Sequence, residues 1–148
     1  MALKGEDDMN RRERTRILIE SRNNIAEKIA DEIRQKYKVN IIQAPENGLT
    51  MVKVRETAKK QLFYLGEVII IEAKCIIDGT IGIGIVANDD EDLVLNLAII
   101  DAAYNKGIEE IERYDKILEE EKIDIERYEE EIAQEILKTK VDFSTMNL

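Results

Sequence analysis

The sequence predicts an α+β fold: a four-stranded antiparallel sheet with two N-terminal helices and two C-terminal helices, the last long and acidic. Apolar residues recur with a helical period near both ends of the chain and at every second position in its middle. Turn-forming pairs separate the alternating segments, so consecutive strands are expected to form hairpins. The chain has 148 residues and no evident linker or repeat, which predicts a single domain over residues 1–148.

The two N-terminal helices are expected over Met9–Arg22 and from Ile25 to Tyr37. In the second helix, Ile25, Ile29 and Ile33 repeat every four residues and form one apolar face. Such a face needs a sheet or another helix to cover it.

The middle of the chain predicts strands joined by turns. Pro45–Gly48 is expected to be a turn because Asn and Gly tolerate a positive φ, Thr57–Lys60 a polar connection, and Asp78–Gly79 a hairpin turn. The third strand is unusually long, which predicts a bend or bulge near Gly66. The four predicted strands are Val39–Ala44, Leu49–Glu56, Leu62–Ile77 and Thr80–Ala87.

The alternation assigns a face to each strand residue. The odd positions from Phe63 to Ile77, all apolar except Glu67, and the residues Ile81, Ile83, Ile85 and Ala87 are expected on the core side. The opposite face then carries two glycines, where a second backbone can approach closely, and two exposed apolar residues. The four candidate partner-contact residues are Gly82, Gly84, Val68 and Ile70.

The C-terminal helices are expected to begin after a cap at Asn88–Asp90, and Gly107 should separate them. The last helix carries half of a coiled-coil seam, because glutamates fill some of the positions that a full seam would give to apolar residues. Val141–Leu148 is expected to be irregular. The seam residues are Ile111, Tyr114, Leu118, Ile125, Tyr128 and Ile132, interrupted by Glu121 and Glu135.

The residue inventory limits the chemistry that this chain can perform. It has no histidine and one cysteine, which excludes histidine-based nucleophile pairs and an iron–sulfur cluster held by this chain alone. Cys75 is expected to be a buried, inert thiol. The net charge of −10 argues against nucleic acid as a partner, because binding a phosphate backbone needs a basic face.

Two motifs have a catalytic and a structural interpretation. Gly82–Ala87 fits the dinucleotide pattern G-x-G-x-x-A, but its alternation favours a strand. Glu67 could be an acid–base group, although a residue at a bend that reaches water is the favoured interpretation. The acidic runs of the last helix indicate a solvated face rather than a metal site. No catalytic residue and no metal site are predicted.

The position of the chain in the cell is predicted from its ends and its hydropathy. It has no apolar run long enough to span a membrane and no signal-peptide pattern at its start. A cytoplasmic location without membrane contact is therefore expected.

Five segments in order resemble the PhnG family, a subunit of the bacterial carbon–phosphorus lyase core complex. The similarity runs from about Arg12 to Met146. The segments are Pro45–Glu56, Phe63–Val68, Asp78–Gly82, the helix residues Ala98, Asp101, Ala102 and Ala103, and Lys140–Met146.

The resemblance implies a role in phosphonate breakdown. PhnG proteins act with H-, I- and J-type subunits as α-D-ribose 1-methylphosphonate 5-triphosphate synthase, a transferase that displaces adenine from ATP with a phosphonate. Catalysis is attributed to the I-type subunit, and an iron–sulfur cluster with S-adenosylmethionine is expected in the J-type subunit. This chain is then an accessory subunit without a cofactor of its own, and homodimer formation stays open for the isolated chain.

Two other functions stay open at the level of sequence. One is a generic α+β interaction or regulatory module unrelated to phosphonates. The other is a small stand-alone enzyme that uses Glu67. Both would be distinguished from the PhnG role by co-purification with the other lyase subunits.

Overall fold

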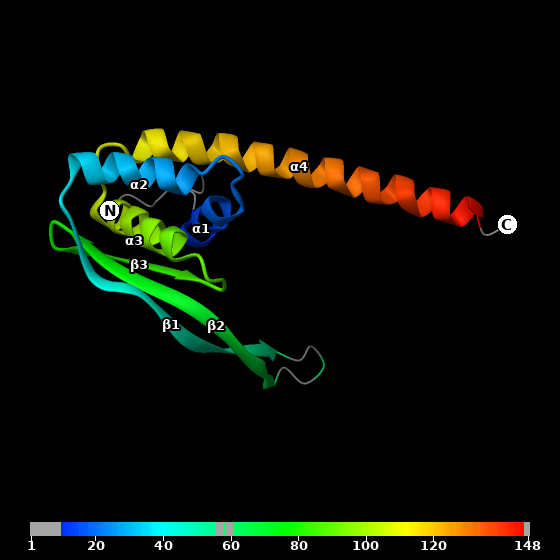
Figure 1. Ribbon diagram of the computed structural model, residues 1–148, viewed down its shortest axis with the longest axis horizontal. Helices are drawn as coiled ribbons and strands as arrows, with labels where there is room; N and C mark the ends of the chain where they lie inside the picture. The colour runs from blue at the N-terminus through cyan, green and yellow to red at the C-terminus, as the bar shows by residue number, and fades with distance from the viewer. Residues whose placement is uncertain (1–9, 56–57, 59–60, 147–148) are drawn as a thin grey trace. The chain divides into compact units, whose positions relative to one another are not determined.

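A three-stranded antiparallel sheet in the order β1-β2-β3 forms the middle of the chain (Figure 1). The structure is a computed structural model that describes residues 10–55, 58 and 61–146. Strand β1 spans Val39–Arg55, β2 spans Leu62–Ile77 and β3 spans Thr80–Val86. The α+β class and the antiparallel pairing agree with the prediction, but the predicted four-stranded sheet is wrong.

The first two predicted strands are one strand, because Pro45–Gly48 lies inside β1. Neither Asn47 nor Gly48 has the positive φ that the predicted turn requires, and both pair with β2. The register shifts between Gln43 and Glu46, so the strand passes the proline through an irregularity. An edge strand tolerates this because only one of its sides needs ladder hydrogen bonds.

Strand β2 contains the predicted irregularity. Val52 pairs with Gly66, whereas Lys53 pairs with Tyr64, so Leu65 is an extra residue on β2. The bulge predicted near Gly66 is therefore confirmed. The predicted connection Thr57–Lys60 lies outside the described residues, apart from Ala58.

The turn between β2 and β3 is the predicted hairpin. Asp78 has φ 45° and Gly79 has φ 81°, which is the left-handed backbone of a two-residue hairpin turn. The following strand ends at Val86, one residue before the predicted end.

The helices begin and end at recognisable signals. The side chain of Asn10 accepts a hydrogen bond from the Glu13 N–H at 2.8 Å, and Asp90 caps its helix in the same way. Gly107 ends that helix with φ 74°. The helices are α1 (Arg11–Glu20), α2 (Ile25–Lys36), α3 (Glu91–Lys106) and α4 (Ile111–Met146).

Helix α4 is longer than predicted. It continues to Met146, so the irregular tail expected from Val141 is wrong as far as that residue. No glycine or proline occurs between Ile111 and Met146, so nothing in the local sequence stops the helix. The remainder of the predicted tail lies outside the described residues.

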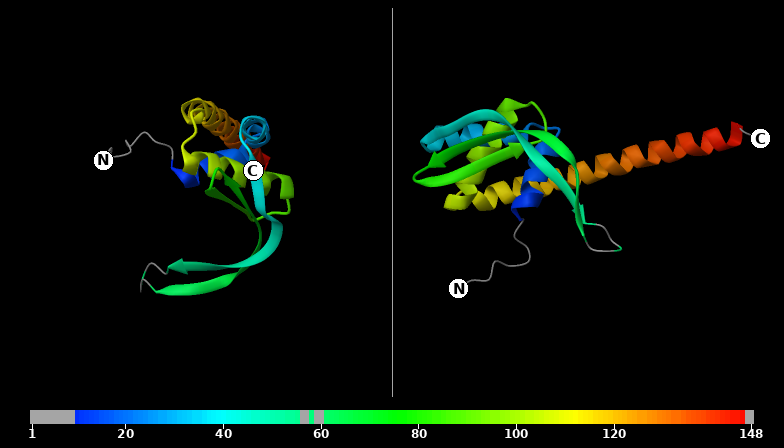
Figure 2. Two further views of the ribbon diagram at one scale, coloured as in Figure 1. Left: turned by 90° about the vertical axis from the view of Figure 1, so that its left-hand side faces the viewer. Right: turned by 90° about the horizontal axis from the view of Figure 1, so that it is seen from below.

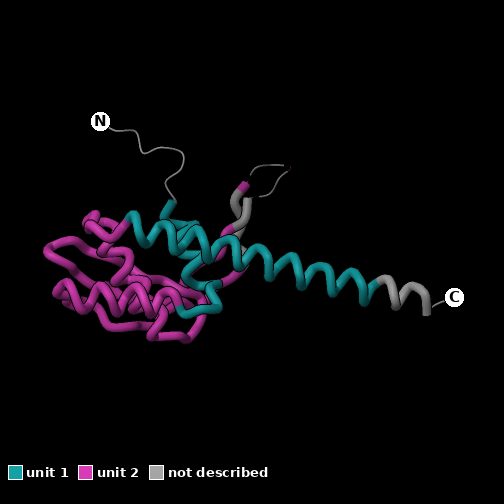
Figure 3. The backbone as a smooth tube through the Cα atoms, turned by 90° about the horizontal axis from the view of Figure 1, so that it is seen from above, with its two compact units in different colours: residues 1–24, 112–148 teal, residues 25–111 magenta. Residues whose placement is uncertain are grey.

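The chain forms two compact units (Figure 3). One unit holds residues 1–24 and 112–148, with α1 and α4; the other holds residues 25–111, with the sheet, α2 and α3. In the second unit α3 packs on all three strands, and α2 packs on α3. The predicted apolar face of α2 is buried, as are Ile71, Ala73, Cys75 and Ile77 of β2.

Candidate partner-binding surfaces

The glycines of β3 face helix α3 of the same chain. Gly82 and Gly84 are buried, whereas Ile81 and Ile85 are about half exposed, so the predicted faces of this strand are inverted. The sequence pattern misled because the isoleucines look like core residues. Here the glycines take the core side and the larger side chains face outwards.

The glycines are needed because the backbone of α3 lies directly on them. A Cβ atom added to Gly82 would lie 2.2 Å from the Ala98 carbonyl oxygen and 2.2 Å from the Ala102 nitrogen. One added to Gly84 would lie 2.2 Å from the Val94 carbonyl oxygen. A close backbone approach was predicted, but the approaching backbone is intramolecular. As partner contacts, Gly82 and Gly84 therefore gain no support from the fold.

Two polar residues of α3 bind the backbone of β3. The Ile83 N–H donates to Asp101 Oδ2 at 2.9 Å, and the Asn105 side-chain amide donates to the Ile81 carbonyl oxygen at 3.0 Å. Asn105 also donates to Asp101 Oδ2 at 3.4 Å. Sequence reasoning did not assign this role to Asp101 and Asn105. The sequence does carry a signal for it: Asp101 and Asn105 are polar residues four positions apart, and so on one face, near the end of an otherwise apolar helix.

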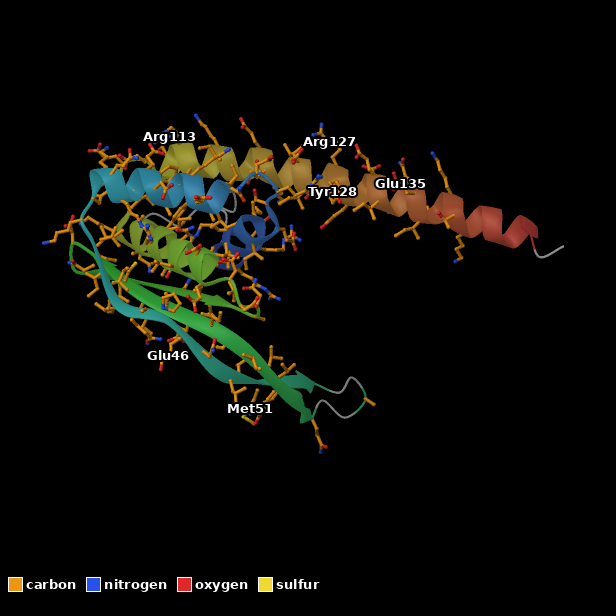
Figure 4. All side chains as sticks on the ribbon, in the orientation of Figure 1. Glu46, Met51, Arg113, Arg127, Tyr128 and Glu135 are labelled. Atoms are coloured by element: carbon orange, nitrogen blue, oxygen red, sulfur yellow. The ribbon has the colours of Figure 1, made fainter. Side chains whose placement is uncertain are left out.

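Beyond the end of β3, strands β1 and β2 continue as a two-stranded ribbon (Figure 2). On the face that α3 covers further back, the ribbon carries large apolar side chains that are mostly exposed: Leu49 is 66% exposed, Met51 58% and Ile69 66%. Figure 4 labels Met51 on this ribbon. Glu67, opposite Met51, is exposed as well, as the favoured interpretation of that residue expected.

The outer face of the sheet is also apolar. Val68 and Ile70, the other two candidate contact residues, are half-buried on it, with Thr50 and Gly48 as their cross-strand partners. Ile81 and Ile85 of β3 extend this face. Among the described residues of this unit, no helix packs on this outer face, since α3 lies on the glycine side.

Helix α4 changes character along its length. Tyr114, Leu118 and Ile125 of the predicted seam are buried, whereas Ile132 and the residues that follow it up to Lys140 are exposed. The side chains of Tyr128 and Glu135 lie in the later part (Figure 4). Arg22 lies over the Tyr128 ring, 3.8 Å from its centroid, which is a cation–π contact between the segment after α1 and this later part of α4.

Glu121 explains one of the interruptions of the seam. Its carboxylate is buried and accepts hydrogen bonds from Ser21 Oγ at 2.9 Å and the Asn23 side-chain amide at 2.8 Å. Lys122 also pairs with Glu13 of α1, at 2.5 Å. The acidic residue in the seam therefore binds the segment after α1, and its role is structural.

A charged cluster joins the end of α2 to the segment after α3. Glu110 accepts hydrogen bonds from Lys36 and from the Tyr37 hydroxyl, the latter at 2.9 Å. The hydrogen bond from Lys36 lowers the pKa of Glu110, and the same bond raises the pKa of Lys36. Burial, together with the bond to Glu110, raises the pKa of Tyr37. The three groups stabilise each other's charge states, and their hydrogen bonds hold the end of α2 to the segment after α3.

The one thiol is in the core under α3. Cys75 is fully buried, and burial raises the pKa of its thiol to about 11. A thiol with this pKa is neutral at physiological pH, so it is a poor nucleophile. The prediction of a buried, inert cysteine agrees with this environment.

The described residues contain no group of three acidic or cysteine side chains placed to hold a metal ion. None of the described helices is long and apolar enough to cross a membrane.

Comparison with known families decides the relationship of the chain. The family described as phosphonate metabolism protein PhnG matches residues 9–147. The chain belongs to the PhnG family. The resemblance predicted from five short segments is thereby confirmed, and a role in phosphonate metabolism follows from the family. No curated protein matches the chain significantly in sequence.

Proposed function

We propose that this chain is an accessory, non-catalytic subunit of a carbon–phosphorus lyase core complex. In this proposal the complex transfers a phosphonate onto the ribose of ATP with release of adenine. The observation that carries the proposal is the family match over residues 9–147. The chain then acts in the cytoplasm with H-, I- and J-type subunits, and the iron–sulfur cluster and S-adenosylmethionine belong to a partner.

The side-chain inventory supports the accessory role. The chain has no histidine for acid–base chemistry near neutral pH, and its one thiol is buried. Several large apolar side chains are exposed, which is typical of surfaces that bind other proteins: Leu49, Met51 and Ile69 on the β1–β2 ribbon, and Ile132, Ile136 and Leu137 on α4. Both features favour a subunit that contributes contacts over one that contributes reacting groups.

No observation favours the stand-alone enzyme. Glu67, its candidate acid–base group, is exposed and lies across from Met51, so neither burial nor a second polar group in the facing position prepares it for catalysis. The generic interaction module gains no support either, since the family belongs to phosphonate metabolism.

A gene deletion tests the proposal. The deletion strain should fail to grow with methylphosphonate as the sole phosphorus source, and the intact gene supplied in trans should restore growth. Growth on inorganic phosphate is the control and should be unchanged. Normal growth of the deletion strain on methylphosphonate would contradict the proposal.

A biochemical test addresses the accessory role itself. Co-expressed H-, I- and J-type subunits should co-purify with this chain, and the purified chain alone should not convert ATP and methylphosphonate. Release of adenine by the isolated chain would assign catalysis to it and would overturn the accessory role.

A further inference from the structure

The sheet has three stretches of unpaired strand edge within the described residues, and they are not equivalent. The outer edge of β3 is occupied by α3, because Asp101 binds the Ile83 N–H and Asn105 binds the Ile81 carbonyl. These two side chains use the backbone groups that another strand would need. Helix α3 therefore protects the β3 edge.

The outer edge of β1 is interrupted. Its register shifts after Ile41 and again between Gln43 and Glu46, next to Pro45. A third register shift lies between Val52 and Lys53, and here the extra residue is on β2. Bulges, prolines and lysines are devices by which edge strands avoid pairing with other chains. Between these irregularities β1 keeps one regular stretch, from Glu46 to Val52, and a register shift bounds it at each end.

The third edge is that of β2 beyond the end of β3. The last pair between these strands is Ile71 with Val86, and β2 continues from there back to Leu62 with only β1 beside it. From Gly66 to Ile77, β2 itself contains no bulged residue, because the extra residues at the register shifts lie on β1. The stretch Gly66–Ile70 has no proline or lysine. It is open, regular and in line with β3.

The hydrogen bonds of β3 fix which groups point to this open edge. The backbone N–H and C=O groups of Ile81 and Ile83 point away from β2, because the Ile83 N–H and the Ile81 carbonyl bind side chains of α3. The alternate residues of β3 must then bond the odd-numbered residues of β2, and the same alternation continues along the strand. The N–H and C=O groups of Glu67 and Ile69 therefore point to the open edge, whereas those of Val68 point to β1.

We propose that an extended segment of a different polypeptide adds to the sheet at this place, pairing with β2 along Gly66–Ile70. Only a strand offers alternating donors and acceptors in the required positions. The exposed side chains beside the edge predict its composition: an apolar residue opposite Ile69 and a basic residue opposite Glu67. This inference rests on the proposed role in a complex and adds the place and the kind of contact.

Charge favours a different polypeptide over a second copy. The chain carries a net charge of −10, so two copies repel each other as they approach. Self-pairing would also bring a second Glu67 to the edge, whereas a partner strand can supply a cation. An isolated two-stranded ribbon is marginally stable in water, so an added strand stabilises the part of the fold that needs it most.

Hydrogen exchange measured on the chain alone and in the co-purified complex tests the inference. In the free chain the amides of Glu67 and Ile69 should exchange much faster than that of Val68. In the complex their exchange should slow by at least about tenfold, while the β1 amides of Asn47, Leu49 and Met51 should change less.

The outcomes separate this inference from the proposed function. A complex that forms without slower exchange at Glu67 and Ile69 overturns the inference and leaves the subunit role intact. Slower exchange confined to the β1 edge overturns it too. If hydrogen exchange at these two amides becomes slower in the free chain as its concentration rises, a second copy occupies the edge and the proposal is wrong. If no complex forms, the proposed function itself fails.

A substitution at the edge gives an independent readout. Ile69→Pro removes one outward N–H, and Ile69 is mostly exposed, so the fold of the chain should survive. Binding to the partner subunits should weaken at least about tenfold. Ile69→Thr changes the side chain but keeps the N–H, and it should bind within about threefold of the wild type. Equal binding by both variants would overturn the inference, and circular dichroism checks that both are folded.

Discussion

The two halves of β2 have similar alternating sequences but opposite surroundings. Ile71–Ile77 pairs on both sides and lies beneath α3, whereas Gly66–Ile70 pairs only with β1 among the described residues. The cause is length. Helix α3 has 16 residues and is about 24 Å long, whereas the 16 residues of β2 extend over about 53 Å. One helix cannot cover a strand with the same number of residues.

The largest expected effect is at the contact between α3 and the sheet. Gly82→Val would place side-chain atoms inside the backbone of α3, since the Cβ alone would lie 2.2 Å from two backbone atoms. We expect the free energy of unfolding to fall by about 3 kcal/mol or more, measured by urea denaturation followed by circular dichroism.

The matched control for Gly82 is on the ribbon. A Cβ on Gly48 would lie 3.7 Å from the nearest atom, the Cγ1 of Ile70, which is an ordinary contact. Gly48→Val should therefore change the free energy of unfolding by less than about 0.5 kcal/mol. Similar losses for the two substitutions would show that the covered and uncovered parts of the sheet do not differ as described.

The next effect concerns the protected β3 edge. Asp101→Ala leaves the Ile83 N–H without its carboxylate acceptor and should lower the free energy of unfolding by about 2 kcal/mol. Asp101→Asn keeps an acceptor and should cost less. Glu67→Ala, an acidic residue on the ribbon, should cost less than about 0.5 kcal/mol. Thermal denaturation ranks the three, and a loss for Glu67→Ala as large as that for Asp101→Ala would contradict the comparison.

Helix α4 offers the same comparison in the other unit. Glu121→Ala removes the acceptor of two side-chain hydrogen bonds, to Ser21 and Asn23, and should lower the free energy of unfolding by about 1–2 kcal/mol. Glu135→Ala is the same change on an exposed part of the helix and should have an effect below about 0.5 kcal/mol. Denaturant titrations that reverse this order would mean that Glu121 does not bind the segment after α1.

The smallest expected effect on stability comes from placing a thiol on the exposed ribbon, but the buried and exposed thiols should differ strongly in their reactivity. Because burial raises the pKa of Cys75 to about 11, its thiol should not react with Ellman's reagent in the native protein at pH 8. Met51→Cys places a thiol on the exposed ribbon, and this variant should release one equivalent rapidly. Both thiols of the variant should react in urea. Rapid reaction of the wild type without urea would show that the core beneath α3 opens.

The thiol also predicts a change of stability with pH. Its pKa is raised on folding, so the stability that it contributes is complete below the pKa of an unfolded thiol and is lost as pH rises towards 11. The thiolate absorbance near 240 nm should rise with a midpoint close to pH 11 in the native protein and lower in urea.

Local chemistry explains which elements could be predicted from the sequence. The face of α2, the Asp78–Gly79 hairpin, the Asp90 cap and the bulge near Gly66 each depend on a few neighbouring residues. The turn predicted at Pro45–Gly48 does not form, because β2 is long enough to pair with one continuous strand through this segment. A proline and a glycine in such an edge strand are then accommodated by a register shift.

The sequence by itself determined the family, the α+β class with antiparallel neighbouring strands, and the lack of histidine, but not the number of strands. Only the tertiary structure decided that the β3 glycines face inwards and that Asp101 and Asn105 protect the β3 edge. It also decided that the ribbon's apolar face is left uncovered. Alternation states which residues share a face, but whether that face is buried depends on which element packs there. Here the shorter rise of a helix leaves the far part of the sheet beyond its reach.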